Sequence, residues 1–99
     1  MKVYISGAIS GTDDYMERFQ KVEDRLLGDG ESVLNPAKFN ANLPAVFTYE
    51  DYMKLDLTMI ELCDAIYMMN GWEKSCGANR EYGYALALGK MILFEGVKS

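Results

Sequence analysis

The chain has 99 residues, enough for one hydrophobic core, and we expect residues 1–99 to form a single domain. Hydrophobic residues make up 49% of it, which is typical of a folded globular protein and excludes an intrinsically disordered chain. A formal net charge of −5 disfavours binding to a nucleic-acid polymer, which takes clustered Lys and Arg side chains.

The residue types also limit the chemistry. The sequence contains no His, and the spacing of Cys63 and Cys76 is not that of a metal site. We therefore expect no metal, no other cofactor and no His-based acid–base catalysis. Two cysteines without a secretory signal indicate free thiols in the cytoplasm. Since no apolar stretch is long enough to cross a bilayer, we expect no membrane partner.

A strand is predicted over residues 3–6, and a loop of small residues leads from it toward a helix, which is the start of a βα unit. Such a loop lets a ligand approach the backbone closely. A plain tight turn explains it about as well, because neither a dinucleotide-binding glycine pattern nor a P-loop is present. The candidate substrate-binding residues in this segment are Ser6, Gly7, Ser10 and Gly11.

The next helix is predicted from about Asp13 to Leu27, opened by Thr12 or Asp13 and ended by glycines. A second strand is predicted over residues 32–34. A loop without a clear period follows over residues 37–47. Loops of that length in compact domains are often functional, so we interpret this one as a cover for one side of a pocket.

Residues 48–51 resemble a capping box that opens a helix running to about Leu62. On a helical wheel, Asp56 lies about 160° from the charged stripe of this helix. It falls on the side that carries Met53 and Ile60. Asp56 is therefore either a buried residue satisfied by a neighbouring backbone group or Tyr hydroxyl, or a functional carboxylate.

The continuous apolar run over residues 65–69 predicts a central parallel strand buried on both faces. A helix is predicted from near Ser75 to Gly89, and a last strand over residues 91–94. Glu81 lies on the inward face of that helix. Since acidic residues are common near helix starts, Glu81 is either a residue that suits the helix dipole or a positioned anionic nucleophile.

Alternating strands and helices with short connections predict an α/β fold. We expect an open, Rossmann- or flavodoxin-like parallel sheet of four or five strands in the order 2-1-3-4, flanked by helices. Ligands of such sheets bind beyond the carboxyl ends of the strands. The loops at residues 6–12, 35–47 and 70–77 should meet at that edge. The start of the helix that carries Glu81 falls there too, so the sequence predicts one cleft.

Four stretches resemble the nucleoside 2-deoxyribosyltransferase-like superfamily, which includes the deoxynucleoside 5′-monophosphate N-glycosidases. They are residues 4–11 (YISGAISG), 54–57 (KLDL), 63–65 (CDA) and 75–83, with the pattern Ser-x-Gly-x-x-x-Glu-x-Gly. The stretch NGWEKSCGA at residues 70–78 is most similar to an uncharacterised branch of small bacterial and phage proteins in that superfamily. The resemblance spans most of the chain in the right order.

The resemblance implies a role for each matching residue. Glu81 would be the nucleophile that attacks C1′ of the sugar. Asp56 would assist at the base or position the attacking group, and Tyr4 would hold Glu81 and the sugar. Ser75 and Gly77 would contact sugar hydroxyl or phosphate oxygens. Two further substrate-binding candidates lie at the same edge, Asn70 and Trp72, although a ring such as that of Trp72 suits either base stacking or a core position.

The predicted function is cleavage or transfer of the N-glycosidic bond of a nucleoside or nucleotide through a glutamate nucleophile. Relatives carry a hydroxyl and a basic side chain in the first loop, where this chain has Ala8 and Ser10. The alternatives are a non-catalytic module that binds or sequesters a nucleotide-like small molecule, and an assembly subunit with a vestigial pocket. We also expect a homodimer or a higher homo-oligomer, because the chain is rich in Met and Tyr.

Overall fold

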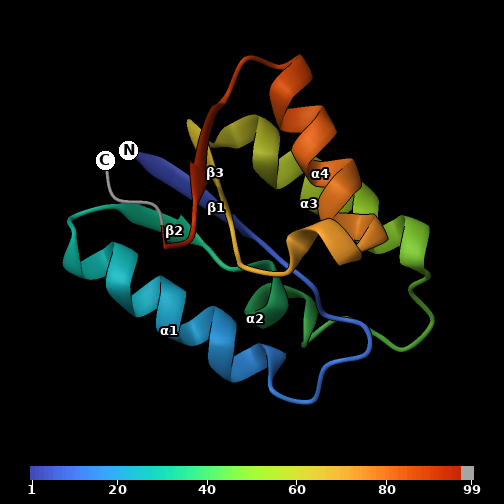
Figure 1. Ribbon diagram of the computed structural model, residues 1–99. Helices are drawn as coiled ribbons and strands as arrows, with labels where there is room; N and C mark the ends of the chain where they lie inside the picture. The colour runs from blue at the N-terminus through green and yellow to red at the C-terminus, as the bar shows by residue number, and fades with distance from the viewer. Residues whose placement is uncertain (97–99) are drawn as a thin grey trace.

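The computed structural model describes residues 1–96, which form a parallel sheet with helices on both faces (Figure 1). The elements in chain order are β1 (Lys2–Ser6), α1 (Tyr15–Gly28), β2 (Ser32–Leu34), α2 (Pro36–Asn40), α3 (Tyr49–Leu62), β3 (Ala65–Met68), the short 3-10 helix η1 (Trp72–Lys74), α4 (Cys76–Ala87) and β4 (Met91–Phe94). Among these residues, no helix is both long and apolar enough to cross a membrane.

The four strands are all parallel and lie in the order β2-β1-β3-β4. β1 and β3 occupy the centre, and Tyr4 is aligned with Leu34 on one side and with Ile66 on the other. All four residues of β3 are buried, as expected for a central strand covered on both faces. The fold class and the strand order predicted from the sequence are confirmed.

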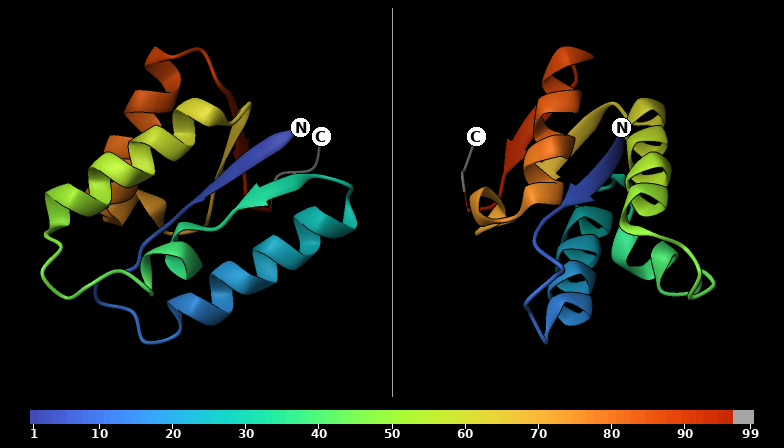
Figure 2. Two further views of the ribbon diagram at one scale, coloured as in Figure 1. Left: turned by 180° about the vertical axis from the view of Figure 1, so that it is seen from behind. Right: turned by 90° about the vertical axis from the view of Figure 1, so that its right-hand side faces the viewer.

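The sheet lies between two helix layers, as the left view of Figure 2 shows, with α1 and α2 on one face and α3 and α4 on the other. Side chains alternate across a strand, so β1 contributes Val3 and Ile5 to one core and Tyr4 to the other. Ser6 is buried on the same side as Tyr4 and reaches α4. The alternation of β1 therefore sends two hydroxyl groups toward α4.

The two helices of the second layer begin where the sequence predicts. Thr48 caps α3, and the reciprocal bonds between Thr48 and Asp51 complete a capping box. The Ser75 hydroxyl caps α4 by accepting a hydrogen bond from the Ala78 N–H at 3.1 Å. Both caps depend on residues that are close in sequence, which is why these boundaries can be predicted without a structure.

The start of α1 and the loop at residues 37–47 differ from the prediction for identifiable reasons. α1 begins at Tyr15, two residues later than predicted, because the Thr12 hydroxyl donates to the carbonyl of Ile9 instead of capping the helix. The predicted loop 37–47 is not all loop, since α2 occupies its beginning. Pro36 suits the first turn of a helix, and the Asn35 side chain caps it. A helix of five residues is too short to show a period in the sequence.

Candidate active site

Glu81 is buried in the second turn of α4, with 5% of its surface exposed. The hydroxyl of Tyr4 donates a hydrogen bond to Glu81 Oε2 at 2.8 Å, and the hydroxyl of Ser6 donates to Oε1 at 2.7 Å. Each oxygen of the carboxyl group therefore has a partner on β1. Because both donors belong to a rigid central strand, the carboxyl group is fixed in position as well as stabilised.

Asp56 is the second buried acid, on α3, with 6% of its surface exposed. Its Oδ1 atom accepts a hydrogen bond from Asn40 Nδ2 at 2.9 Å. Asn40 is the last residue of α2, so this bond joins the two helix layers at the carboxyl edge of the sheet. Asp56 and Glu81 come from separate helices, as the sequence predicts.

The two acids influence each other's protonation. Burial raises the pKa of Glu81 to about 8, and the nearby charge of Asp56 adds to that effect, whereas the hydroxyls of Ser6 and Tyr4 oppose it. Burial likewise raises the pKa of Asp56, and the bond from Asn40 opposes that shift. Burial and the neighbouring Glu81 charge hold the pKa of Tyr4 well above its ordinary value, so this phenol stays a donor. The pair therefore retains one proton near neutral pH.

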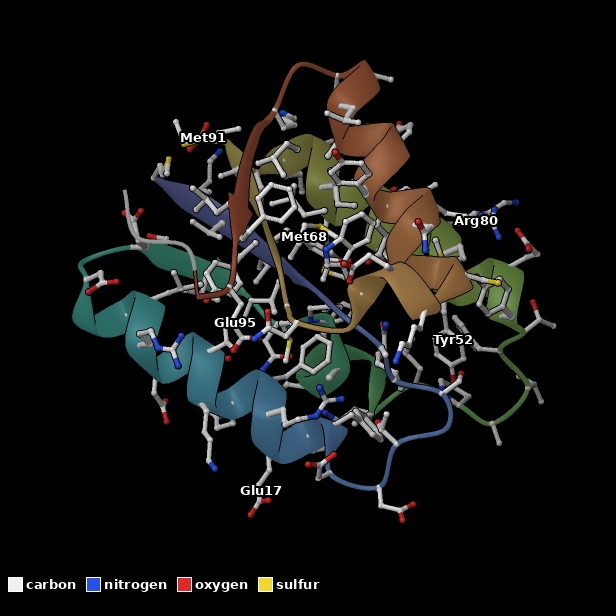
Figure 3. All side chains as sticks on the ribbon, viewed as in Figure 1. Glu17, Tyr52, Met68, Arg80, Met91 and Glu95 are labelled. Atoms are coloured by element: carbon white, nitrogen blue, oxygen red, sulfur yellow. The ribbon has the colours of Figure 1, made fainter. Side chains whose placement is uncertain are left out.

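A cavity of about 710 Å³ lies at the carboxyl end of β1, and both acids line it. Its walls come from the loop at residues 7–10, from α2, from α3 and from residues 74–78 at the start of α4. Figure 3 shows Tyr52 of α3 near the loop that follows β1, and both line this cavity. The volume is in the range of small-molecule sites, and its position is the ligand-binding edge of open α/β sheets.

The rim of the cavity carries an ordered aromatic side chain. The Arg80 guanidinium makes two hydrogen bonds with the Glu50 carboxylate, at 2.9 and 3.1 Å, and lies 5.6 Å from the centre of the Tyr49 ring. The Arg80 bonds hold the pKa of Glu50 below its ordinary value. These contacts join the first turn of α3 to α4, and the Tyr49 ring they hold lines the cavity.

The structure brings most of the predicted site residues together. Gly7, Ser10, Ser75 and Gly77 line the cavity with the two acids. The backbone at Gly7 comes so close to Met69 that an added Cβ would lie 3.0 Å from that side chain, so a larger residue there would require Met69 to shift. Tyr4 and Ser6 lie behind Glu81 and contact it directly.

Three predicted substrate-binding residues are not brought to this cavity. Trp72 packs in the second core, with its ring centre 4.7 Å from that of Tyr82, because burying a large ring against β4 is favourable. Asn70 is exposed, and its N–H donates to the Glu95 carboxylate. Gly11 lies in an exposed turn with a φ of 79°. Their predicted role in binding finds no support in their positions.

The residue that the sequence prediction misses is Asn40. Its Nδ2 atom holds Asp56, but its Oδ1 atom is closed off from solvent and has no hydrogen-bond partner among residues 1–96. Leaving a buried carbonyl oxygen unpaired costs about 1–3 kcal/mol, so such an atom calls for an explanation. The only signal in the sequence is the loop in which it lies. Within the same described range, no group of three His, Cys, Asp or Glu side chains comes together as a metal site.

The fold is that of the nucleoside 2-deoxyribosyltransferases. The 2-deoxyribosyltransferase of Bacillus psychrosaccharolyticus matches all of this chain over 77% of its own length, with a TM-score of 0.77 and 18% identity. That of Leishmania mexicana matches 94% of this chain, with a TM-score of 0.70 and 30% identity, and the chain spans only 62% of its length. The CMP N-glycosidase of Clostridium botulinum matches 95% of this chain over 67% of its own, with a TM-score of 0.61 and 25% identity.

Among curated protein sequences, none is significantly similar to this chain. The sequence pattern of one family, described as a domain of unknown function (DUF4406), matches residues 1–94. That range includes all four strands, both helix layers and both buried acids. The chain therefore belongs to the DUF4406 family.

Proposed function

We propose that this protein cleaves or transfers the N-glycosidic bond of a nucleoside or nucleotide, with Glu81 as the nucleophile. The observation that carries the proposal is the meeting of two buried carboxyl groups, from separate helices, at one cavity of ligand size. Two acids beside the scissile bond are the arrangement that glycoside hydrolysis uses. The similarity to 2-deoxyribosyltransferases and to a CMP N-glycosidase supports the same chemistry.

In the form of the pair that reacts, the shared proton is on Asp56 and Glu81 is a carboxylate. A Glu81 oxygen attacks C1′ as the bond between C1′ and the base nitrogen breaks. The electron pair of that bond goes to the base, which takes the proton from Asp56. The product is a glycosyl ester on Glu81 and a neutral free base.

In the second half, the glycosyl ester is resolved at the same carbon. Water attacks C1′, releases the Glu81 carboxylate and gives a proton to Asp56, which completes hydrolysis. When a ring nitrogen of a second base attacks instead, that nitrogen loses its proton to Asp56 and the outcome is transfer. Two successive displacements at C1′ retain its configuration.

The groups around the acids suit this sequence of steps. The hydroxyls of Tyr4 and Ser6 stabilise Glu81 when it is charged, and they hold its carboxyl group in place beside β1. The Ser75 hydroxyl accepts from a backbone N–H and keeps its own proton for a sugar or phosphate oxygen. Backbone N–H groups at the start of α4, near Gly77, favour a negatively charged ligand atom.

The test is incubation with a panel of nucleosides and nucleotides, with free base measured by chromatography. We expect base release by the wild type and none by Glu81→Gln. Glu17→Gln is the matched control, because Glu17 is an exposed residue on α1 that points into solvent (Figure 3) and does not line the cavity. Absence of base release, together with a nucleotide that raises the melting temperature of the wild type, would favour the non-catalytic binding module.

The proposal extends to a homodimer in the cytoplasm. Support for the dimer comes from large apolar side chains that are exposed near the edge strand β4, among them Leu86, Leu88, Met91 and Phe94. Sedimentation equilibrium measures the mass, which should be twice that of the 11.2 kDa chain. A mass of one chain at all concentrations tested would contradict the dimer.

A further inference from the structure

Only one of the two polar atoms of the Asn40 amide makes a hydrogen bond. It lies in the wall of the cavity, and its Nδ2 atom donates to Asp56 Oδ1 at 2.9 Å. Its Oδ1 atom has no partner among residues 1–96 and no contact with solvent. The carboxyl group fixes which end is free, because a carboxylate oxygen accepts and only the amide nitrogen donates. Asn40 therefore places an unused acceptor next to Asp56.

The bond from Asn40 also gives the two oxygens of Asp56 different roles. Since Oδ1 already accepts from Asn40 Nδ2, a proton on Asp56 belongs on Oδ2. In that state the two joined side chains carry a donor, the Asp56 O–H, and an acceptor, the Asn40 carbonyl, which is enclosed until the amide turns toward a ligand. A ligand edge that fits this wall has an acceptor and a donor next to each other.

Amino-substituted bases have such an edge. Adenine presents N7 as an acceptor and the N6 amino group as a donor, and cytosine presents N3 beside its N4 amino group. A 6-oxopurine or 4-oxopyrimidine places a carbonyl oxygen where the amino group would be, and two acceptors then face each other. We propose that Asn40 is a specificity-determining residue that selects 6-aminopurine and 4-aminopyrimidine nucleosides or nucleotides over their oxo counterparts.

The selection rests on the proposed function, because that function assigns the base to the Asp56 side of the cavity. The unpaired Oδ1 atom is enclosed, so it reaches a base only when the Asn40 amide turns toward the cavity. That rotation breaks no hydrogen bond at Oδ1, since none is present, but it must be slight enough to keep the bond from Nδ2 to Asp56. The amino group of the base then donates a hydrogen bond to Asn40 Oδ1, which otherwise has no partner. An oxo base has no donor at that position and leaves Oδ1 unpaired.

The test compares kcat/KM for two matched pairs, deoxyadenosine with deoxyinosine and deoxycytidine with deoxyuridine. We expect the wild type to prefer the amino member of each pair by about tenfold or more. Asn40→Ala should reduce that preference to within about threefold of unity, by lowering the rate with amino substrates. Asn42→Ala is the matched control, because Asn42 lies two residues further on, is exposed and does not line the cavity, and it should keep the wild-type preference.

Asn40→Asp provides a second variant with a different signature. It keeps an acceptor but replaces the donor to Asp56 by a third carboxylate, which disfavours the charged form of Asp56. We expect the alkaline limb of the pH–rate profile, where Asp56 loses its proton, to move to higher pH by about one unit, a change that a purely structural role of Asn40 would not produce. Melting curves of both variants establish that they are folded.

Binding separates this inference from the proposed function. The same four nucleosides are titrated by calorimetry into the wild type and Asn40→Ala, each carrying Glu81→Gln to prevent reaction. Cleavage without amino preference, or a preference that survives Asn40→Ala, overturns the selectivity and leaves the proposed function intact. Tighter binding of amino nucleosides that depends on Asn40, in a protein that releases no base, supports the selectivity and overturns the catalytic proposal. No preference in either measurement overturns the selectivity.

Discussion

The two faces of β1 differ in chemistry although one strand makes both. On the α1 and α2 face, Val3 and Ile5 belong to a core of apolar side chains. On the α3 and α4 face, Tyr4 and Ser6 hold the carboxyl group of Glu81. Both faces gain stability by excluding water from apolar groups, but the second also encloses an acid at a cost. The comparison indicates that the first face serves packing alone, whereas the second combines packing with a buried carboxyl group whose position β1 fixes.

The largest expected effect is loss of base release when Glu81 is replaced. Glu81→Gln keeps the size of the side chain but removes the attacking oxygen, so the rate of base release should fall by at least roughly a thousandfold. Chromatography of free base measures the loss, and the folded state is checked by circular dichroism. A variant that retains a tenth of the wild-type rate would rule out Glu81 as the nucleophile.

Leu26→Ala tests the apolar face. Leu26 is buried on α1 and does not line the cavity, so the change should lower the free energy of unfolding by about 2–4 kcal/mol. Urea denaturation measures this change. The rate of base release below the melting transition should remain that of the wild type. A rate that falls along with stability would show that the two faces are not separable in this way.

The pH dependence of stability tests the opposite face. Because the pKa of Glu81 is raised from 4.5 to about 8 in the folded state, its contribution to stability is full below pH 4.5 and is lost as the pH rises through 8. Gln carries no such charge. Glu81→Gln should therefore be more stable than the wild type at pH 9, by roughly 1–3 kcal/mol, and this advantage should disappear below pH 4.5.

Urea denaturation at both pH values provides the measurement. The control is Glu17→Gln, an exposed acid on α1 outside the cavity, which should show no such alkaline gain. If Glu81→Gln is no more stable than the wild type at pH 9, the ionised Glu81 carboxylate does not destabilise the folded protein.

Tyr4→Phe gives the smallest expected effect. It removes the hydroxyl that donates to Glu81 Oε2 at 2.8 Å, while Ser6 still supports the other oxygen. Loss of a donor to the charged form raises the pKa of Glu81 further. The rate should fall about tenfold at neutral pH, and the acid limb of the pH–rate profile should move to higher pH. A lower rate with an unchanged profile would contradict this role of Tyr4.

Local patterns in the sequence account for much of the site. The capping residues Thr48 and Ser75 set the starts of α3 and α4, and the helical period places Asp56 and Glu81 on inward faces. These are properties of neighbours within one or two turns. The alternation of β1 likewise follows from the period of a strand, which holds wherever the strand lies in the sheet.

What the sequence by itself determined is therefore the set of elements, their order and the direction in which each acid points. Only the tertiary structure decided which side chains meet: Ser6 with Glu81, Asn40 with Asp56, and Trp72 with Tyr82 instead of the cavity. The physical reason is the sequence separation of the contacts, because the helical and strand periods relate only residues that are close in sequence. A contact such as that between Ser6 and Glu81, which are 75 residues apart, depends on how whole layers pack.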